Sequence, residues 1–236
     1  PGEKSVPGVD RPIGSGVLVK KVIGDRQRTL LVTARHVAYA ASAICPKREI
    51  LLCGESSIGR IALNDDPWLI DPEKDDDLAL VDVTDLGLDF RAIDLDCKES
   101  LVCLRSDQLA EHGIVAGAKA VAVCGDPATT NFVPKAGYYA GEKRGYQVFA
   151  INAVPGNSGS PVFVCDVEKN VVYFVGIYSL GSTGKHDSMG AVPLDNLYRM
   201  IELGADEYFN NDDKRNAQQP RYNVESGIAL MKRKGI

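Results

Sequence analysis

The sequence predicts an all-β protein, and three observations support this fold class. Short runs of apolar and β-branched residues recur along most of the 236-residue chain and are separated by turn residues. Segments with the three-to-four-residue apolar period of a helix are few and short. The strand candidates do not alternate with helices as they do in a parallel α/β sheet, so an antiparallel barrel or sandwich is favoured.

The strand candidates begin with a hairpin. Its two strands span residues 13–22 and 28–33, and Gly24 and Asp25 connect them. The remaining strand candidates span residues 49–53, 78–83, 101–104, 119–124, 146–150, 161–165 and 171–179.

Helix candidates are limited to three segments. Residues 36–43 follow the first hairpin, and residues 106–112 form a second short candidate. The clearest helix spans residues 194–203, because its apolar residues are spaced by three and four and Gly204 follows as a stop signal.

The chain divides into two halves at a polar, Asp-rich connection near residues 85–99. Two β-barrels with a cleft between them would fit this division. The predicted units are a flexible N-terminal segment (1–12), a first barrel (13–95), a second barrel (96–193), a C-terminal helix (194–209) and a C-terminal extension (210–236).

Composition restricts the classes of partner and cofactor. No apolar run is long enough to cross a bilayer, so no membrane-spanning segment is expected. The net charge of −5 argues against a general nucleic-acid binder, which usually presents a basic face. The six cysteines form no Cys-x-x-Cys pair and there are three histidines, so we expect neither a metal site nor another cofactor. The oligomeric state stays open.

The strongest chemical signal is the segment Pro-Gly-Asn-Ser-Gly-Ser-Pro at residues 155–161. A serine hydroxyl becomes a nucleophile only beside a base, and it must stand on a tight turn. The flanking glycines permit such a turn around Ser158. The N–H groups of Gly156 and Ser158 would then bind a developing oxyanion. The alternative is an ordinary surface turn that leads into a strand.

A base and an acid are available elsewhere in the chain. His36 lies directly after a predicted strand, in Thr-Ala-Arg-His, where a general base could face a cleft. Asp77 precedes the apolar run Leu-Ala-Leu and could be buried against the imidazole. Asp82 lies inside the same strand pattern and is the chief rival, whereas Asp75 and Asp76 are expected to stay solvated.

Three motifs in chain order, Thr-Ala-x-His, Asp-Leu-Ala-Leu and Gly-Asn-Ser-Gly-Ser-Pro, resemble those of the trypsin-like (chymotrypsin-fold) serine proteases. The order of His36, Asp77 and Ser158 differs from that of subtilisins and α/β-hydrolases. The bacterial stand-alone trypsin-like peptidases are the most similar members. The resemblance implies two six-stranded antiparallel β-barrels, a catalytic triad of these three residues, and a serine endopeptidase that cleaves proteins or peptides.

The same resemblance places the substrate. It implies that Asn152 lies near the floor of the primary specificity pocket and that Gly181 and Gly190 line its walls. Substrate backbone would pair with Ser179, Leu180 and Gly181 as an added strand. No acidic residue stands at the implied floor, so an uncharged substrate side chain is expected.

Two departures from the family pattern are informative. Val37 stands where secreted animal enzymes carry a disulfide cysteine, which favours a reducing, cytoplasmic compartment. A signal peptide removed before Pro1 stays an open alternative. Asn157 replaces the aspartate that pairs with a newly cut N-terminus, so the site is expected to be organised by another route.

Two rival interpretations remain. The first is a catalytically silent chymotrypsin-fold module that binds peptides. The second is an α/β-hydrolase, in which His186 would be the base. The sequence argues against this class, because Ser160 occupies the position of the last glycine in the Gly-x-Ser-x-Gly motif.

Overall fold

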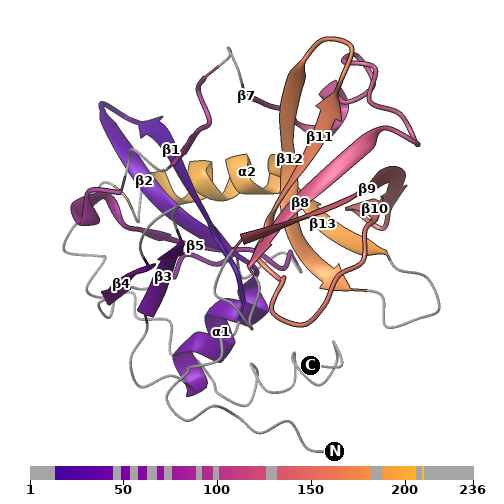
Figure 1. The fold of residues 1–236 in the computed structure, drawn as a ribbon. Coiled ribbons are helices and arrows are strands. Elements are labelled where there is room, and N and C mark those ends of the chain that lie inside the picture. The colour runs from indigo at the N-terminus through magenta and orange to yellow at the C-terminus, as the bar shows by residue number, and fades with distance from the viewer. Residues whose placement is uncertain are drawn as a thin grey trace, which may run out of the picture.

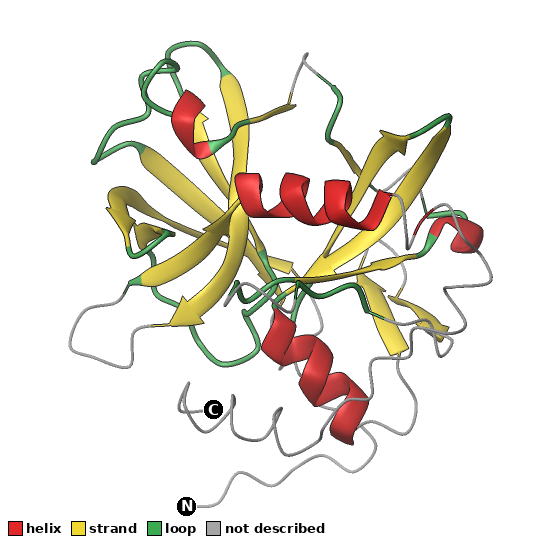
Figure 2. Ribbon diagram, turned by 180° about the vertical axis from the view of Figure 1, so that it is seen from behind, coloured by secondary structure: helices red, strands yellow, loops and turns green. Residues whose placement is uncertain are grey.

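The computed structural model describes residues 14–44, 49–53, 58–62, 68–71, 76–88, 92–97, 101–125, 132–181, 188–205 and 209. Two β-sheet bodies lie side by side, and helix α2 (Leu194–Gly204) lies between them in Figure 1. The view from behind shows the same helix running across both bodies (Figure 2). The protein is therefore mostly β, as the sequence predicts. None of the described helices is both long and apolar enough to cross a membrane.

The N-terminal body is an open sheet of four strands in the order β5-β2-β1-β6. Strand β6 runs parallel to β1, whereas the other neighbours are antiparallel. Strands β3 and β4 form a separate hairpin. The bounds are β1 Val17–Ile23, β2 Arg26–Thr33, β3 Glu49–Cys53, β4 Ile58–Ala62, β5 Ala79–Asp82 and β6 Ile93–Asp94.

The C-terminal body is a closed antiparallel barrel of six strands. Its order is β11-β8-β9-β10-β13-β12, and pairing of β11 with β12 completes the ring. Strand β7 adds to β12 in parallel outside the ring. The bounds are β7 Leu101–Cys103, β8 Lys119–Gly125, β9 Phe132–Lys143, β10 Tyr146–Ala150, β11 Pro161–Asp166, β12 Val171–Gly181 and β13 Met189–Pro193.

The prediction of two closed six-stranded barrels is thus correct for one body only. Closure requires each strand to pair on both edges. Among the described residues, β6 is two residues long and pairs only with β1, and the outer edge of β5 receives a single bridge from Leu69 to Leu80. The first body is therefore an open mixed sheet.

Helix predictions were accurate at two of three places. Helix α1 spans Arg35–Ile44, and α2 begins at Leu194 as expected. The third candidate, at residues 106–112, is a single 3₁₀ turn, Ser106–Gln108, followed by turns.

Strand β9 (Phe132–Lys143) was not predicted, because its sequence contains proline and glycine. Pro134, Gly137 and Gly141 interrupt the pattern that strands usually show, and most of the strand is exposed. Gly137 is required by a close approach: a Cβ atom there would lie 2.0 Å from the carbonyl oxygen of Ala150 on β10. Gly137 therefore interrupts the strand pattern in the sequence and, in the structure, allows β9 and β10 to approach closely within the barrel.

The main hydrophobic core joins the two bodies. It contains Val19 and Leu30 from the first sheet, Phe174 and Ile177 from β12, and the buried face of α2. A second core fills the barrel, around Phe149 and Val162. Because one core is shared, the edge where the two bodies meet is held in a fixed geometry.

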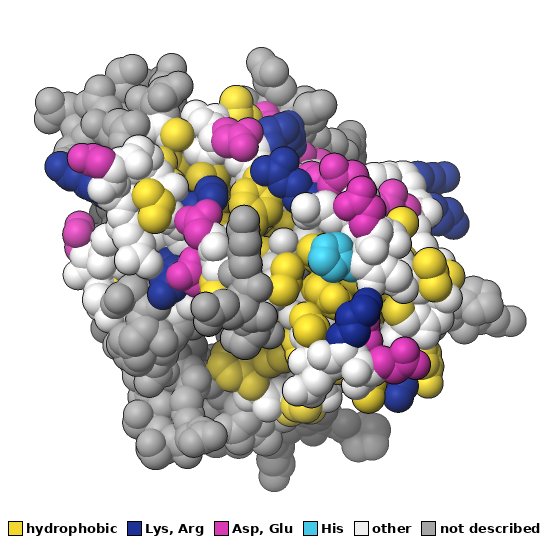
Figure 3. Space-filling view, turned by 90° about the horizontal axis from the view of Figure 1, so that it is seen from above, with side chains coloured by type: hydrophobic (Ala, Val, Ile, Leu, Met, Phe, Trp, Pro, Cys, Tyr) yellow, Lys and Arg dark blue, Asp and Glu magenta, His cyan; other side chains and the backbone are white. Residues whose placement is uncertain are grey.

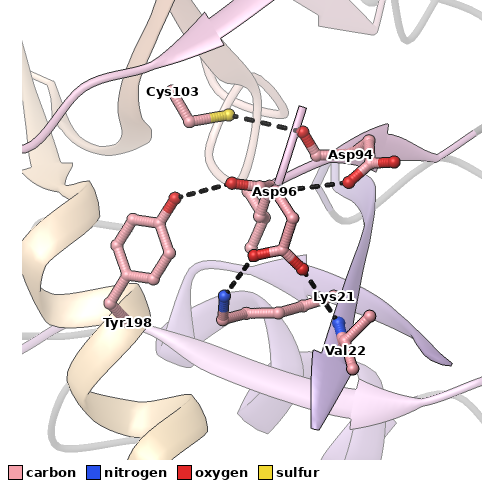
Figure 4. A network of polar contacts seen from close by, with 7 residues as sticks. Lys21, Val22, Asp94, Asp96, Cys103 and Tyr198 are labelled. Atoms are coloured by element: carbon pink, nitrogen blue, oxygen red, sulfur yellow. Dashed lines mark hydrogen bonds and ion pairs between the residues drawn. The ribbon is translucent and has the colours of Figure 1, made fainter. Parts of the chain in front are cut away.

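The segment between the two bodies is also tied down by polar contacts (Figure 4). The Asp96 carboxylate accepts hydrogen bonds from Lys21 Nζ at 2.6 Å and from the Val22 N–H at 3.0 Å. The Tyr198 hydroxyl of α2 donates to the Leu95 carbonyl at 3.2 Å, and Cys103 Sγ lies 3.9 Å from the Asp94 carbonyl oxygen. The connection is thus bonded to β1 on one side and to α2 on the other.

Cys103 makes this connection sensitive to alkaline pH. Burial, together with the negative charges of Asp94, Cys97 and Asp96, raises the pKa of its thiol to about 12. In the unfolded chain the thiol ionises near pH ~8.5. Because the thiol loses its proton at lower pH in the unfolded chain than in the folded protein, high pH favours unfolding. The stability that the protonated thiol allows is fully present below about pH 8.5 and is lost as pH rises towards about 12.

We therefore expect Cys103→Ala to weaken the alkaline loss of stability. The free energy of unfolding, measured with urea at pH 7.5 and 10.5, should fall less in the variant than in the wild-type protein. Equal losses in the two proteins would contradict this assignment.

Candidate active site

His36 and Asp77 emerge at the same end of the first sheet. Strands β2 and β5 are antiparallel, and Thr33 at the end of β2 pairs with Ala79 at the start of β5. His36 follows this point by three residues and Asp77 precedes it by two, so both side chains lie at one edge. Both are almost fully buried, with 4% of His36 and 1% of Asp77 exposed.

The Asp77 carboxylate is surrounded by donors. Its Oδ1 atom accepts from the His36 backbone N–H at 3.0 Å, and its Oδ2 atom lies 2.6 Å from His36 Nδ1. The Ser179 hydroxyl of β12 donates to Oδ2 at 2.5 Å. A carboxylate beside Nδ1 favours the tautomer with the proton on Nδ1, which leaves Nε2 as the acceptor of the neutral ring. His36 is therefore oriented and prepared to take a proton.

The rival carboxylates have other partners. Asp82 bonds to Arg28 at 3.2 Å and to Thr84, and so forms a buried ion pair away from the histidine. Asp76 pairs with Arg199 of α2, so the expectation that it stays solvated was wrong. Asp75 lies outside the described residues. Of the described carboxylates named here, Asp77 is the one bonded to the His36 ring.

Ser158 stands on a tight turn between two glycines in left-handed conformations. The φ angles of Gly156 and Gly159 are both +94°, which L side chains rarely adopt. The N–H groups of Asn157, Gly159 and Ser160 donate to the carbonyls of Val154, Tyr178 and Asn157. Within the part of the chain that the structure describes, the N–H groups of Gly156 and Ser158 donate to no carbonyl. With respect to the described residues, the two groups predicted for an oxyanion hole are therefore uncommitted.

Ser15 fastens this serine loop to the first sheet. Its N–H donates to the Ser158 carbonyl at 2.7 Å, and its hydroxyl donates to the Gly156 carbonyl at 2.9 Å. Its own carbonyl accepts from the Thr33 hydroxyl at 2.6 Å, just before α1. The loop is thus held against the end of β2, the strand that leads to His36.

The fit at this junction leaves no room for side chains at two glycines. A Cβ atom on Gly159 would lie 1.8 Å from the Ser15 carbonyl oxygen and 2.4 Å from the Thr33 hydroxyl. A Cβ atom on Gly14 would lie 2.5 Å from the Val37 side chain and 3.1 Å from the Ser158 carbonyl oxygen. Ser158 therefore sits close to the first turn of α1.

The structure joins part of the predicted triad. His36, Asp77 and Ser179 form one hydrogen-bonded group. Ser158 is placed on the adjoining loop, but among the described residues no hydrogen bond links its hydroxyl to the His36 ring. Catalytic hydrogen bonds are often long in a ligand-free protein and tighten when substrate binds.

The residues predicted for substrate binding have mixed positions. Ser179 lies at a bulge of β12 and its hydroxyl points to Asp77, a contact that the sequence analysis did not foresee. Leu180 pairs with Gly190 of β13, on one edge of β12 only. Asn152 is exposed after β10. Residues 182–187, next to the implied pocket wall at Gly181, lie outside the described residues, so the pocket stays a prediction.

The sequence also did not predict two residues that support the loop from outside it, Lys135 and Ser15. Lys135 Nζ lies 2.8 Å from Asn157 Oδ1, and Ser15 bonds to Gly156. Nothing local in the sequence connects Ser15 with a segment 141 residues away. The Ser15 contact arises only when the two bodies meet, and the Lys135 contact arises when β9 and the serine loop meet within the barrel.

Charges on the face shown in Figure 3 are mixed. Lys and Arg side chains lie beside Asp and Glu side chains rather than gathering into a basic patch. Among the described residues no group of three or more His, Cys, Asp or Glu side chains is arranged to hold a metal ion.

No known protein-family model and no curated protein matches this chain. The geometry of the site is therefore the basis on which its function is inferred.

We expect Asp77→Ala to destabilise the fold. The variant leaves two buried donors, the His36 N–H and the Ser179 hydroxyl, without their acceptor, which should lower the free energy of unfolding by about 2–4 kcal/mol. The exposed Asp85 provides a matched control, and Asp85→Ala should change it by less than about 0.5 kcal/mol. Urea unfolding measures both; equal values for the two variants would contradict the role of Asp77 as a buried acceptor.

Proposed function

We propose that this protein is a serine endopeptidase of the trypsin-like kind, with His36, Asp77 and Ser158 as its catalytic triad. The observation that supports it best is the combination of a buried, oriented histidine with two uncommitted N–H groups on a serine turn fastened beside it. In this proposal the open N-terminal sheet corresponds to the first barrel of the chymotrypsin fold, and the closed barrel to the second.

In the proposed reaction each of these groups has a distinct role. His36 Nε2 takes the proton of the Ser158 hydroxyl as its oxygen attacks the scissile carbonyl carbon. The resulting oxyanion accepts hydrogen bonds from the N–H groups of Gly156 and Ser158. His36 then gives the proton to the leaving amine, and water attacks the acyl-enzyme with His36 again as base. Asp77 stabilises the imidazolium throughout. No cofactor is required.

Substrate would bind as an additional strand. Beside residues 179–181, β13 occupies one edge of β12, and no described strand pairs with the other edge. An extended peptide could hydrogen-bond along this edge. The partner of the site is thus a peptide or protein chain in an extended conformation.

A second candidate function is a catalytically silent peptide-binding module. The absence of a hydrogen bond between Ser158 and His36 among the described residues favours it. The two candidates differ in the reactivity of the serine, because only an activated hydroxyl reacts readily with a fluorophosphonate.

We expect the full chain to be labelled by a fluorophosphonate at Ser158, as mapped by mass spectrometry, and to hydrolyse an unfolded protein such as casein. Ser158→Ala should abolish labelling and reduce hydrolysis by at least about 10³-fold, while the circular dichroism spectrum stays unchanged. Ser106→Ala, a hydroxyl deletion away from the site, serves as the control and should retain both activities.

Peptide binding without labelling or hydrolysis by the wild-type chain would favour the silent module. Hydrolysis that persists in Ser158→Ala would overturn the assignment of the nucleophile.

A further inference from the structure

Asn157 lies between the N–H groups of Gly156 and Ser158, and both polar atoms of its side chain are hydrogen-bonded. Only 1% of the residue is exposed. Its Oδ1 atom accepts from the Val154 N–H at 2.9 Å and from Lys135 Nζ at 2.8 Å. Its Nδ2 atom donates to the Gly125 carbonyl at 3.2 Å. Because both partners of Oδ1 are donors, they determine which way the amide is turned.

The amide of Asn157 thereby fixes the peptide planes on either side of it. Two hydrogen bonds join Val154 and Asn157. The Val154 N–H donates to Asn157 Oδ1, and the Asn157 N–H donates to the Val154 carbonyl at 3.1 Å. The Asn157 carbonyl accepts from the Ser160 N–H at 3.1 Å. In a trans peptide the N–H points opposite to the C=O. The Ser158 N–H is therefore turned away from Ser160 and left uncommitted.

Lys135 reaches this amide from an inward-facing position of β9. Burial alternates along the strand: Lys135, Gly137 and Tyr139 are more buried than the exposed residues between them. An inward-facing ammonium group is costly unless it is paired. Burial raises the pKa of the nearby Cys124 thiol, and the charge of Lys135 acts against that shift. The ammonium thus lies beneath the serine loop.

A second contact completes the support. Gly125, at the end of β8, accepts from Asn157 Nδ2 through its carbonyl and donates its N–H to the Ser15 hydroxyl at 3.2 Å. Ser15 in turn donates to the Gly156 carbonyl. One chain of hydrogen bonds therefore supports the loop from both sides. It runs through Lys135, Asn157, Gly125 and Ser15.

We propose that Lys135 is a positioning residue of the active site: through Asn157, its ammonium group holds the loop in the conformation that presents the Gly156 and Ser158 N–H groups to the oxyanion. This inference rests on the proposed function. A hydrogen bond from an ammonium group is about twice as strong as one between neutral groups, so the charge of Lys135 adds to the rigidity of the loop.

The test compares Lys135→Met, which keeps the length of the side chain but removes the charge, with Lys135→Arg, which keeps a charged donor. Lys143→Met, an exposed lysine on the same strand, is the matched control. Kinetics with a small peptide ester and the rate of fluorophosphonate labelling report on the oxyanion hole. Lys135→Met should lower kcat about 10–100-fold with a change in KM below about 3-fold. Lys135→Arg should recover most of kcat, and Lys143→Met should match the wild type.

Hydrogen exchange provides a readout that does not depend on catalysis. The Val154 N–H donates to Asn157 Oδ1, so loss of the ammonium should speed its exchange at least about 10-fold in ¹⁵N-resolved NMR spectra. The variant Lys135→Met/Asn157→Ala should lose no more kcat than Asn157→Ala alone, because the lysine acts through the asparagine.

The outcomes separate the two proposals. If the wild-type chain neither labels nor hydrolyses, the proposed function fails, and Val154 exchange still tests the support of the loop. If Lys135→Met folds and keeps both the wild-type kcat and the wild-type Val154 exchange, the positioning role of Lys135 is overturned. Additive losses in the double variant would also overturn it.

Discussion

Ser15 connects the two bodies at the point on which the candidate site depends. It bonds to Ser158 and Gly156 in the loop of the barrel and to Thr33 in the first sheet. The glycines on either side of the contact let the backbones approach to distances that a side chain would prevent. This contact ties the serine turn of the barrel to the strand end that leads to His36.

The shared core makes that contact rigid. Apolar residues of β1, β2 and β12 pack with α2 in a single cluster, so the first sheet and the barrel cannot shift independently without opening buried surface. Phe209, beyond α2, lies in the same cluster, and its carbonyl accepts from Arg28 at 2.6 Å. The packing of Phe209 is thus part of what holds the two bodies together.

Three buried or part-buried charges near the site are each compensated in a different way. Asp77 is surrounded by the histidine and a serine hydroxyl, Asp82 by an arginine, and Lys135 meets a neutral amide. Two aspartates of the same apolar strand region therefore have different chemical surroundings. The difference follows from which strand end each one occupies: Asp77 precedes β5 at the sheet edge, and Asp82 closes it.

Local sequence was sufficient where neighbouring residues decide the structure. The alternation of apolar residues predicted most strands, the spacing of apolar residues predicted α2, and the two glycines predicted the turn at Ser158. The motif around Asp77 correctly selected it over Asp82 as the partner of His36. For the strands, α2 and the turn at Ser158, the determining pattern lies within a few neighbouring residues, and the Asp77 motif carries its information in the apolar run that follows it.

Only the tertiary structure decided the remaining features. Three such features depend on segments that are distant in the chain. They are the closure of one sheet and not the other, the hydrogen bond from Ser179 to Asp77, and the support of Asn157 by Lys135. Strand β9 was not predicted because Gly137 is needed for the close approach of Ala150 on β10, a contact that the local sequence pattern does not show. The sequence by itself determined which chemical groups are present and how each local turn is shaped. The folding of two bodies onto one core determined which of those groups meet, because hydrogen bonds and close contacts depend on positions that no local pattern records.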